Sequence, residues 1–201
     1  MISEDSVVDL LMKSEIIGVD VWIAGGWGVD ALVGYQTRPH NDVDFFIQKK
    51  DKTAMTELLT SSGYKENMEY NIEDNPVWCD TSKGIVDLHL FEFAETGLWR
   101  IQNQTFPSDI FDGKGTIGGI TVRCMTAEAQ VNYRHGYELR EKDVLDVLLL
   151  CNTFGLPVPA QFKEVTPEFK DFLSEVAPDY REFVANAHEL LLHDNYKFKI
   201  E

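Results

Sequence analysis

Residues 25–44 read GGWGVDALVGYQTRPHNDVD and lie between two short apolar runs. The run before them, VWIA, predicts a strand, and the Gly pair predicts the entrance to a short helix. Because Gly25 and Gly26 carry no side chains, a phosphate can approach the free backbone N–H groups at this helix entrance. The run after the stretch, FFI, predicts a second strand.

Two acids, Asp42 and Asp44, lie two residues apart where this second strand begins. Side chains alternate between the faces of a strand, so both carboxylates project from the same face. Neighbouring carboxylates repel each other unless a cation lies between them, and Mg2+ is a cation that prefers such oxygen ligands. The alternative is an exposed edge strand with two solvated acids. The Gly-rich element upstream favours a metal site for nucleotide chemistry.

This pattern resembles the nucleotidyltransferase superfamily of DNA polymerase β, in which a Gly-rich turn, a short helix and Asp-x-Asp on the next strand follow in order. More narrowly, it is similar to the antibiotic nucleotidyltransferases that act on lincosamides and aminoglycosides. The residues that carry the narrower resemblance are Gly25, Gly26, Trp27, Asp30, Gly34, Arg38, His40, Asp42 and Asp44. Many superfamily members have Gly-Ser at the turn, whereas this chain has Trp27 in place of that hydroxyl.

A second segment, which contains Glu128-Ala129-Gln130 and ends in YRHGYEL at 133–139, is similar to the C-terminal part of the lincosamide enzymes. Packing of a helix that ends at a Gly is one interpretation of this segment. The other is that Tyr133, His135 and Tyr137 line the nucleotide or drug pocket.

The resemblance implies an α/β (α+β) nucleotidyltransferase fold, with a mixed β-sheet flanked by helices and a helical C-terminal extension. Hydrophobic patterning and Gly, Pro and Asn punctuation predict strands at 21–24, 42–47, 67–72, 77–81, 85–93 and 120–124, and helices at 3–17, 27–34, 51–62, 127–137, 141–153, 167–175 and 178–193. The connection over 94–119 is long and Gly-spotted and has room for a hairpin. We expect a catalytic domain over 1–156 and the helical extension over 157–201, divided near Pro157.

A third carboxylate, Asp87, lies within the apolar run 85–91. Burial of an acid costs free energy unless the acid is paired or bound to a metal, and the alternative is an acid at a strand end that faces solvent. In the resembling family a third carboxylate comes from a neighbouring strand, and Asp87 matches it. The resemblance therefore implies that Asp87 accepts the proton of the attacking hydroxyl and also contacts metal. The predicted catalytic and metal-binding residues are Asp42, Asp44 and Asp87.

The predicted nucleotide-binding residues are Gly25, Gly26, Trp27, Arg38 and His40. A guanidinium can hold phosphate oxygens through two hydrogen bonds, and for Arg38 the alternative is an ion pair with Asp30. For His40 a structural hydrogen bond competes with phosphate contact. His89 is equally consistent with the edge of the core and with a substrate pocket.

The composition of the 201 residues limits the class of partner. The apolar fraction of 44% suits a packed core. The formal net charge of -16, from 18 basic and 34 acidic residues, repels nucleic acids and favours a cationic or neutral partner. The chain has no apolar run long enough for a membrane span and no targeting leader, so we expect a cytoplasmic protein without a membrane partner. The three Cys have no metal-ligand spacing or pairing pattern and are expected to be reduced.

These observations predict a Mg2+-dependent nucleotidyltransferase that transfers a nucleoside monophosphate, AMP from ATP, to a hydroxyl of a small cationic antibiotic. By resemblance the acceptor is a lincosamide first and an aminoglycoside second. The alternative is a protein of the same fold that modifies tRNA or a protein partner, as in some toxin–antitoxin pairs, and the net charge disfavours tRNA. The C-terminal helices are expected to form the acceptor side of the site or a contact in a homodimer.

Overall fold

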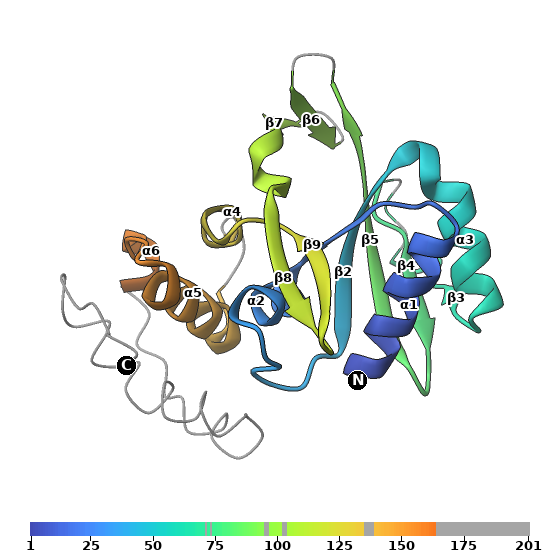
Figure 1. Cartoon of the computed structure of the whole chain (residues 1–201), viewed down its shortest axis with the longest axis horizontal. Coiled ribbons are helices and arrows are strands. Elements are labelled where there is room, and N and C mark those ends of the chain that lie inside the picture. The colour runs from blue at the N-terminus through green and yellow to red at the C-terminus, as the bar shows by residue number, and fades with distance from the viewer. Residues whose placement is uncertain (71, 73, 95–96, 102–103, 135–138, 164–201) are drawn as a thin grey trace.

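In the computed structural model, residues 1–70, 72, 74–94, 97–101, 104–134 and 139–163 are described, and within them nine strands form one mixed sheet (Figure 1). The strands are β1 (Val21–Ala24), β2 (Asp42–Gln48), β3 (Lys65–Glu66), β4 (Val77–Asp80), β5 (Gly84–Phe93), β6 (Leu98–Ile101), β7 (Gln104–Pro107), β8 (Gly113–Ile117) and β9 (Ile120–Cys124). Their order is β3-β4-β5-β2-β1-β9-β8, with β6 paired to β5 and β7 paired to β6. β2 and β5 are parallel, as are β1 and β9, and the other pairs are antiparallel. The predicted mixed sheet is confirmed.

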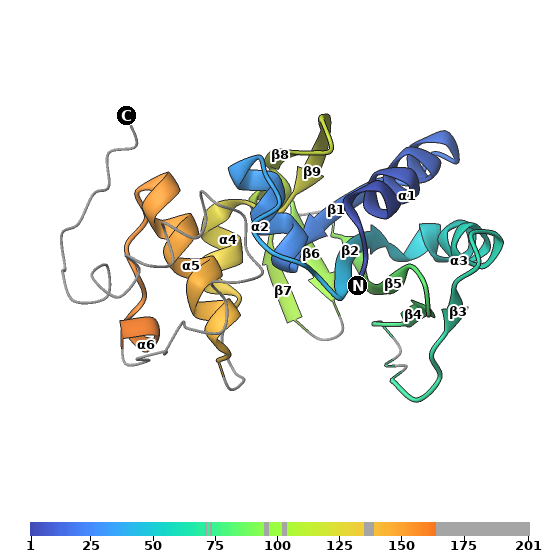
Figure 2. The same ribbon diagram turned by 90° about the horizontal axis from the view of Figure 1, so that it is seen from below.

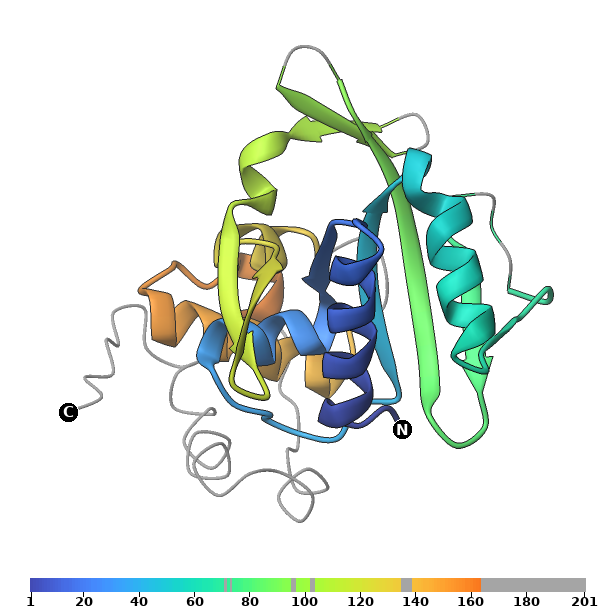
Figure 3. The same cartoon turned by 45° about the vertical axis from the view of Figure 1, so that its right-hand side comes forward.

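Helices gather into two groups. The described helices are α1 (Glu4–Ile16), α2 (Gly25–Val33), α3 (Lys52–Ser61), α4 (Ala127–Asn132), α5 (Glu141–Phe154) and α6 (Ala160–Lys163), with 3-10 turns at Lys49–Asp51 and Ser108–Phe111. α1 and α3 lie side by side over one face of the sheet (Figure 3). α4, α5 and α6 gather on the opposite side of α2 from α1 and α3 (Figures 1 and 2). α2 packs against α4 and α5.

Strand periodicity separates the core from the site. Along β2, Val43, Phe45 and Ile47 are buried in the main core, and this leaves Asp42, Asp44 and Phe46 on the other face. The same alternation in β5 buries Val86, Leu88 and Leu90 in that core. Consequently Asp87 and His89 share the face of the sheet on which Asp44 lies.

α2 packs against two separate hydrophobic clusters, because different faces of the helix contact different elements. Trp27 and Ala31 pack into the main core, whereas Val29 packs with the apolar residues of α4 and α5. Phe162, in α6 and beyond the predicted boundary at Pro157, is fully buried in this second cluster. The division at 1–156 and 157–201 stays a prediction, because residues 164–201 and the two helices expected there lie outside the described residues.

Several element predictions differ from the structure. α2 begins at Gly25, so the Gly pair forms the first turn of the helix instead of preceding it. The predicted strand 67–72 is wrong: β3 ends at Glu66, and the side chain of Asn67 accepts a hydrogen bond from the N–H of Glu69 at 3.1 Å, which bends the chain into a turn.

The connection over 94–119 contains the β6–β7 hairpin, and it also contains β8, which was not predicted. α4 ends at Asn132, before the predicted 137, and His135 and Tyr137 lie outside the described residues. Within the described part of the chain, no helix has the length and apolar character needed to cross a membrane.

Candidate active site

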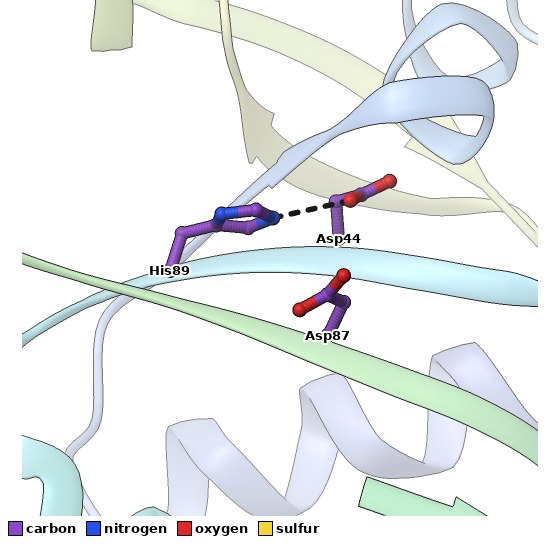
Figure 4. Close-up of side chains that lie close together, drawn as sticks. All are labelled: Asp44, Asp87 and His89. Carbon is purple, nitrogen blue, oxygen red and sulfur yellow. Dashed lines mark hydrogen bonds and ion pairs between the residues drawn. The ribbon is translucent and has the colours of Figure 1, made fainter. Parts of the chain in front are cut away.

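The parallel pairing of β2 with β5 brings acids that are distant in sequence together. The register aligns Asp44 with Asp87, and Phe46 with His89. Ligand atoms of Asp44, Asp87 and His89 all lie within 4.8 Å of one another (Figure 4). Asp42 lies on the same face of β2 but is exposed and stands outside this group.

The ring of His89 is held by a contact at each of its two nitrogens and by stacking on another ring. Its Nε2 lies 3.1 Å from Oδ1 of Asp44, the contact drawn in Figure 4. Its Nδ1 lies 2.5 Å from the side-chain nitrogen of Asn75. The ring stacks on Phe46, with 4.5 Å between the ring centroids. His89 is therefore a residue of the site and not of the core edge.

Burial and neighbouring charges separate the pKa values of the two aligned acids. Burial raises the pKa of Asp87 to about 6, and the charges of Asp44 and Asp42 add to this effect while His89 opposes it. Burial also opposes ionisation of Asp44, but the hydrogen bond and charge of His89, with Arg134 and Lys142, lower its pKa below the ordinary value. Burial acts against protonation of His89, yet the hydrogen bond and charge of Asp44 raise its pKa.

Two glycines of the opening turn make room for side chains of the site. A Cβ on Gly25, which has a φ of +61°, would lie 1.8 Å from Oδ2 of Asp44. A Cβ on Gly26 would lie 2.5 Å from Nδ1 of His40. Any larger residue at either position would therefore displace a side chain of the site.

A buried network of polar side chains packs against this turn at Gly26. Oδ2 of Asp30 lies 2.5 Å from Nε2 of His40, and Oδ1 of Asp30 accepts hydrogen bonds from the N–H and hydroxyl of Thr37. Arg38 donates to Nδ1 of His40 at 3.0 Å. Because arginine can only donate, this Nδ1 must accept, and the proton of the neutral ring is on Nε2, where it faces Asp30.

The acid that pairs with Arg38 is Asp146 of α5, at 2.9 Å, and not Asp30, the partner weighed from the sequence. Asp146 also accepts from Arg134 at 3.1 Å, and the side chains of all three residues are buried. Sequence reasoning missed Arg134 and Asp146. One signal was available for Asp146, because it is an acid within the apolar run VLDVLLL of α5, as Asp87 is within β5.

These elements enclose a cavity of about 520 Å³. Of the predicted site residues, Gly25, Gly26, Arg38, His40, Asp42, Asp44 and Asp87 line it. Trp27 does not line it and is 1% exposed in the main core. The wall formed by β2, the β6–β7 hairpin and the residues that flank α4 is mostly aromatic and apolar, with Phe46, Trp99, Ile101, Phe106, Met125 and Tyr133. Four basic residues line the remaining side: Arg38 before β2, Arg134 after α4, Arg140 before α5 and Lys142 within α5.

The donor atoms fit a hard divalent cation. Oδ1 of Asp87 is buried and has no hydrogen-bond partner among the described residues. Asp44 and Asp87 bring two carboxylates together on one face, and the exposed Asp42 adds a third nearby on that face. Carboxylate oxygens are ligands that Mg2+ prefers, and this group offers them on one face of the sheet.

The mixed sheet, the aligned carboxylates and the glycine-lined helix entrance define a nucleotidyltransferase. The sequence profile of the family described as Aminoglycoside-2''-adenylyltransferase matches residues 6–150, and the chain belongs to this family. The resemblance to antibiotic nucleotidyltransferases predicted from the sequence is thereby confirmed, and so are the fold and the enzyme class.

Three relatives illustrate the likeness. A lincosamide resistance protein from Staphylococcus haemolyticus is 26% identical over 156 residues, which cover 73% of this chain and 92% of that protein. The crystal structure of the lincosamide antibiotic adenylyltransferase LnuA with lincomycin bound is 27% identical, with a TM-score of 0.66, and the match covers 74% of this chain and 96% of that one. The structure of ANT(2'')-Ia in complex with adenylyl-2''-tobramycin shares the fold at 16% identity, with a TM-score of 0.63 and coverage of 94% and 98%.

Proposed function

We propose that this enzyme transfers AMP from ATP to a hydroxyl of a small antibiotic in a Mg2+-dependent reaction, with a lincosamide as the first candidate acceptor and an aminoglycoside as the second. The observation that carries the proposal is the alignment of Asp44 with Asp87 at the wall of a cavity of about 520 Å³. The lincosamide and aminoglycoside enzymes named above support the choice of acceptors. Because ATP is found in the cytoplasm, we propose that the reaction takes place in that compartment.

Asp42, Asp44 and Asp87 would hold Mg2+ through their carboxylate oxygens. The ion, when bound, would neutralise charge on the phosphates and orient them for in-line displacement. Exposure of Asp42 at the start of β2 gives it access to solvent-borne metal, whereas Asp44 is fixed by its hydrogen bond to His89.

Asp87 would act as the general base. The oxygen of the acceptor hydroxyl forms the new bond to the α-phosphorus, the bond from that phosphorus to pyrophosphate breaks, and the hydroxyl proton passes to Asp87. Burial raises the pKa of Asp87 to about 6 when no cation is bound, so this carboxylate is more basic than an ordinary aspartate.

The nucleotide would approach Gly25 and Gly26, where the N-terminus of α2 favours phosphate. Arg38 lines the cavity and would contact the phosphates directly. His40 would act through Arg38, because both of its ring nitrogens already have partners in Arg38 and Asp30. Trp27 would support the turn from within the core.

The acceptor would lie against the aromatic wall. Phe46, Trp99, Phe106 and Tyr133 offer ring faces and edges, and carboxylates lie nearby on β2 and β5. A lincosamide combines apolar groups with one amine, so it matches this wall better than a polycationic aminoglycoside does.

The test is incubation with Mg-ATP and a panel of lincosamides and aminoglycosides, followed by mass spectrometry of the drug. We expect the mass gain of one adenylyl group with the wild type. Asp42→Asn and Asp44→Asn should abolish it, whereas Asp9→Asn, which breaks a surface ion pair with Lys13, should not. Full turnover in either site variant, or labelling of an RNA or a protein in place of any drug, would contradict the proposal.

A further inference from the structure

Residues 74–76, which precede β4, run alongside β5 next to the acids of the site. The backbone oxygens of Asp74 and Pro76 accept hydrogen bonds from N–H groups of β5 at 2.8 and 3.1 Å. These bonds continue the antiparallel register of β4 with β5, although Pro76 has no N–H to return to its partner strand. Asn75, between the two bonds, therefore lies opposite His89, and a cross-strand pair of this kind brings two side chains into contact.

The side chain of Asn75 determines which ring nitrogen of His89 carries the proton. The amide nitrogen of Asn75 lies 2.5 Å from Nδ1 of the ring. An amide NH2 group can only donate, so Nδ1 accepts this hydrogen bond and the ring is neutral. The proton of a neutral ring is then on Nε2, which lies 3.1 Å from Oδ1 of Asp44 and donates to it. One chain of hydrogen bonds thus runs from Asn75 through His89 to Asp44.

The two carboxylate oxygens of Asp44 have different surroundings. Oδ1 accepts the hydrogen bond from His89. Oδ2 lies at the glycine turn, where a Cβ on Gly25 would be 1.8 Å from it. Because a carboxylate that is held at one oxygen presents the other in a fixed direction, the chain from Asn75 orients Oδ2 towards the place that the phosphates would approach.

The same chain of hydrogen bonds decides which atoms are left for a metal. His89 lies close enough to Asp44 and Asp87 to count as a third ligand by distance alone. An imidazole nitrogen binds a metal through an unprotonated lone pair, but Nε2 carries the proton and Nδ1 accepts from Asn75. The carboxylates are therefore the donors that this group offers. Carboxylate oxygens suit Mg2+, whereas an added imidazole would favour Zn2+ or Ni2+.

We propose that Asn75 is a positioning residue which, through His89, orients the carboxylate of Asp44 and keeps the imidazole out of the ligand set of the metal. The inference rests on the proposed function for the assignment of Asp44 to the metal. The state of the ring does not depend on that function, and it can be measured in the metal-free protein.

The direct test is NMR spectroscopy of the whole chain with isotope-labelled histidines, in which the nitrogen chemical shifts show where the ring proton lies. The loss of one set of signals in His89→Gln identifies this ring among the five histidines. At alkaline pH, where histidine is neutral, we expect the wild type to carry the proton on Nε2 and to keep it when Mg2+ is added. A proton on Nδ1, or loss of the Nε2 proton on addition of Mg2+, overturns the proposal.

Asn75→Asp reverses the contact with little change in shape. A carboxylate accepts where the amide donated, so Nδ1 should gain a proton in the same spectra. Asn67→Ala is the matched control, because Asn67 lies in the same connection between β3 and β4 and its side chain contacts Glu69 and Cys79 instead. The control should leave the ring as in the wild type. An unchanged ring in Asn75→Asp, or the same change in the control, overturns the contact.

The Mg2+ concentration that gives half-maximal turnover tests the effect on Asp44. His89→Gln should raise it by about 10- to 100-fold, as expected for the loss of a group that orients a metal ligand. Asn75→Ala should raise it by about 2- to 10-fold, since one neutral hydrogen bond is lost. Because Asn75 acts through the ring, the double variant should need no more Mg2+ than His89→Gln alone. Multiplied losses in the double variant would contradict the positioning role.

Failure of the positioning role can be distinguished from failure of the proposed function. If the wild-type enzyme adenylylates a drug while Asn75→Asp leaves the ring of His89 unchanged, the positioning role is wrong and the function stands. If Asn75→Asp moves the proton as expected but the wild type modifies no drug, the control of the ring by Asn75 stands and the proposed acceptor is wrong.

Discussion

Asp87 is the residue to which we assign the role of general base. Asp87→Asn should slow the chemical step by roughly 100- to 10,000-fold, because general-base removal has effects of this size, while the affinity for Mg-ATP changes little. Single-turnover rates and nucleotide titration on this one variant give both quantities. Weaker nucleotide binding would indicate that Asp87 is chiefly a metal ligand. A wild-type rate would transfer the base role to another group, and His89 is the first alternative.

Gly25 combines a positive φ with a filled space. Gly25→Ala should reduce both activity and the free energy of unfolding, because its Cβ would lie 1.8 Å from Oδ2 of Asp44. Gly18→Ala is the matched control: its φ is +74°, but nothing lies within 4 Å of the added Cβ. Both variants should lose about 1 kcal/mol through backbone strain, and only Gly25→Ala should lose turnover. Chemical denaturation and drug assays measure the two effects, and equal turnover would remove the packing argument.

At this scale the sequence predicted the acids better than the basic residues. Asp44 and Asp87 stand out because a strand period or an apolar neighbourhood makes a carboxylate conspicuous. For Arg38 an ion pair with Asp30, eight residues away, was the alternative to phosphate contact, and the acid that it pairs with is Asp146, which is 108 residues away. Local sequence carries no information on such a contact. His40 and Gln130 depend on glycines for their space, and spacing alone does not say which side chain fills it.

The start of α5 is fixed by charge. Asp143 accepts hydrogen bonds from the backbone and guanidinium of Arg140. Burial alone would raise the pKa of Asp143, but these bonds and the charge of Arg140 lower it. The folded-state pKa is thus below the unfolded value, so the stabilisation is present above about pH 4 and is lost as the pH falls through the folded-state pKa.

Asp143→Ala should therefore cost about 0.5–2 kcal/mol of unfolding free energy at pH 7, and the difference from wild type should shrink towards pH 3. Urea unfolding at the two pH values measures this. Ser3→Ala is the control, because Ser3 caps α1 through a hydroxyl that does not titrate. Its cost should be the same at both pH values, and a pH-independent cost for Asp143→Ala would contradict the assignment.

The β6–β7 hairpin presents the aromatic wall. Phe106 stacks on Trp99 with 4.7 Å between centroids and contacts the ring edge of Tyr133. Phe106→Ala should raise the KM for the drug by roughly 2- to 10-fold through loss of aromatic contact, and should leave the KM for ATP unchanged. Phe154→Ala, at an exposed position of α5, should change neither KM. An equal rise in the KM for ATP would mean that the wall is not specific to the acceptor.

Elements with a strong period were predicted correctly, and elements set by local turns were not. β2, β5 and α5 follow from apolar spacing, and α3 begins within one residue of its expected start. The segment 67–72 contains Met68, Tyr70 and Ile72, which suggest a strand, but the side chain of Asn67 competes for the backbone. Four of the five residues of β8, GKGTI, are small or polar, and one Ile gives no apolar period, so the sequence does not predict the pairing of β8 with β9.

For the molecule as a whole, the net charge of -16 sets opposite salt responses for the two substrates. Screening lengths fall from about 30 Å at 0.01 M salt to about 8 Å at 0.15 M. Over this range we expect kcat/KM to fall for a cationic drug, because attraction is screened, and to rise for ATP, because repulsion is screened. Steady-state kinetics at both salt concentrations test this. Parallel responses of the two substrates would show that the local charges of the cavity outweigh the overall field.

The glycine-lined turn also limits how this enzyme can diversify. Positions 25, 26 and 28 each accommodate a side chain from another element, namely Asp44, His40 and Gln130. Substitutions at these three positions of α2 would therefore disturb the site, so we expect few of them during adaptation to a new drug. The hairpin of β6 and β7 packs its rings against one another and tolerates exchange of one apolar shape for another. Selection under a changing antibiotic should accumulate substitutions in that hairpin, while the helix entrance stays fixed across all surviving lineages.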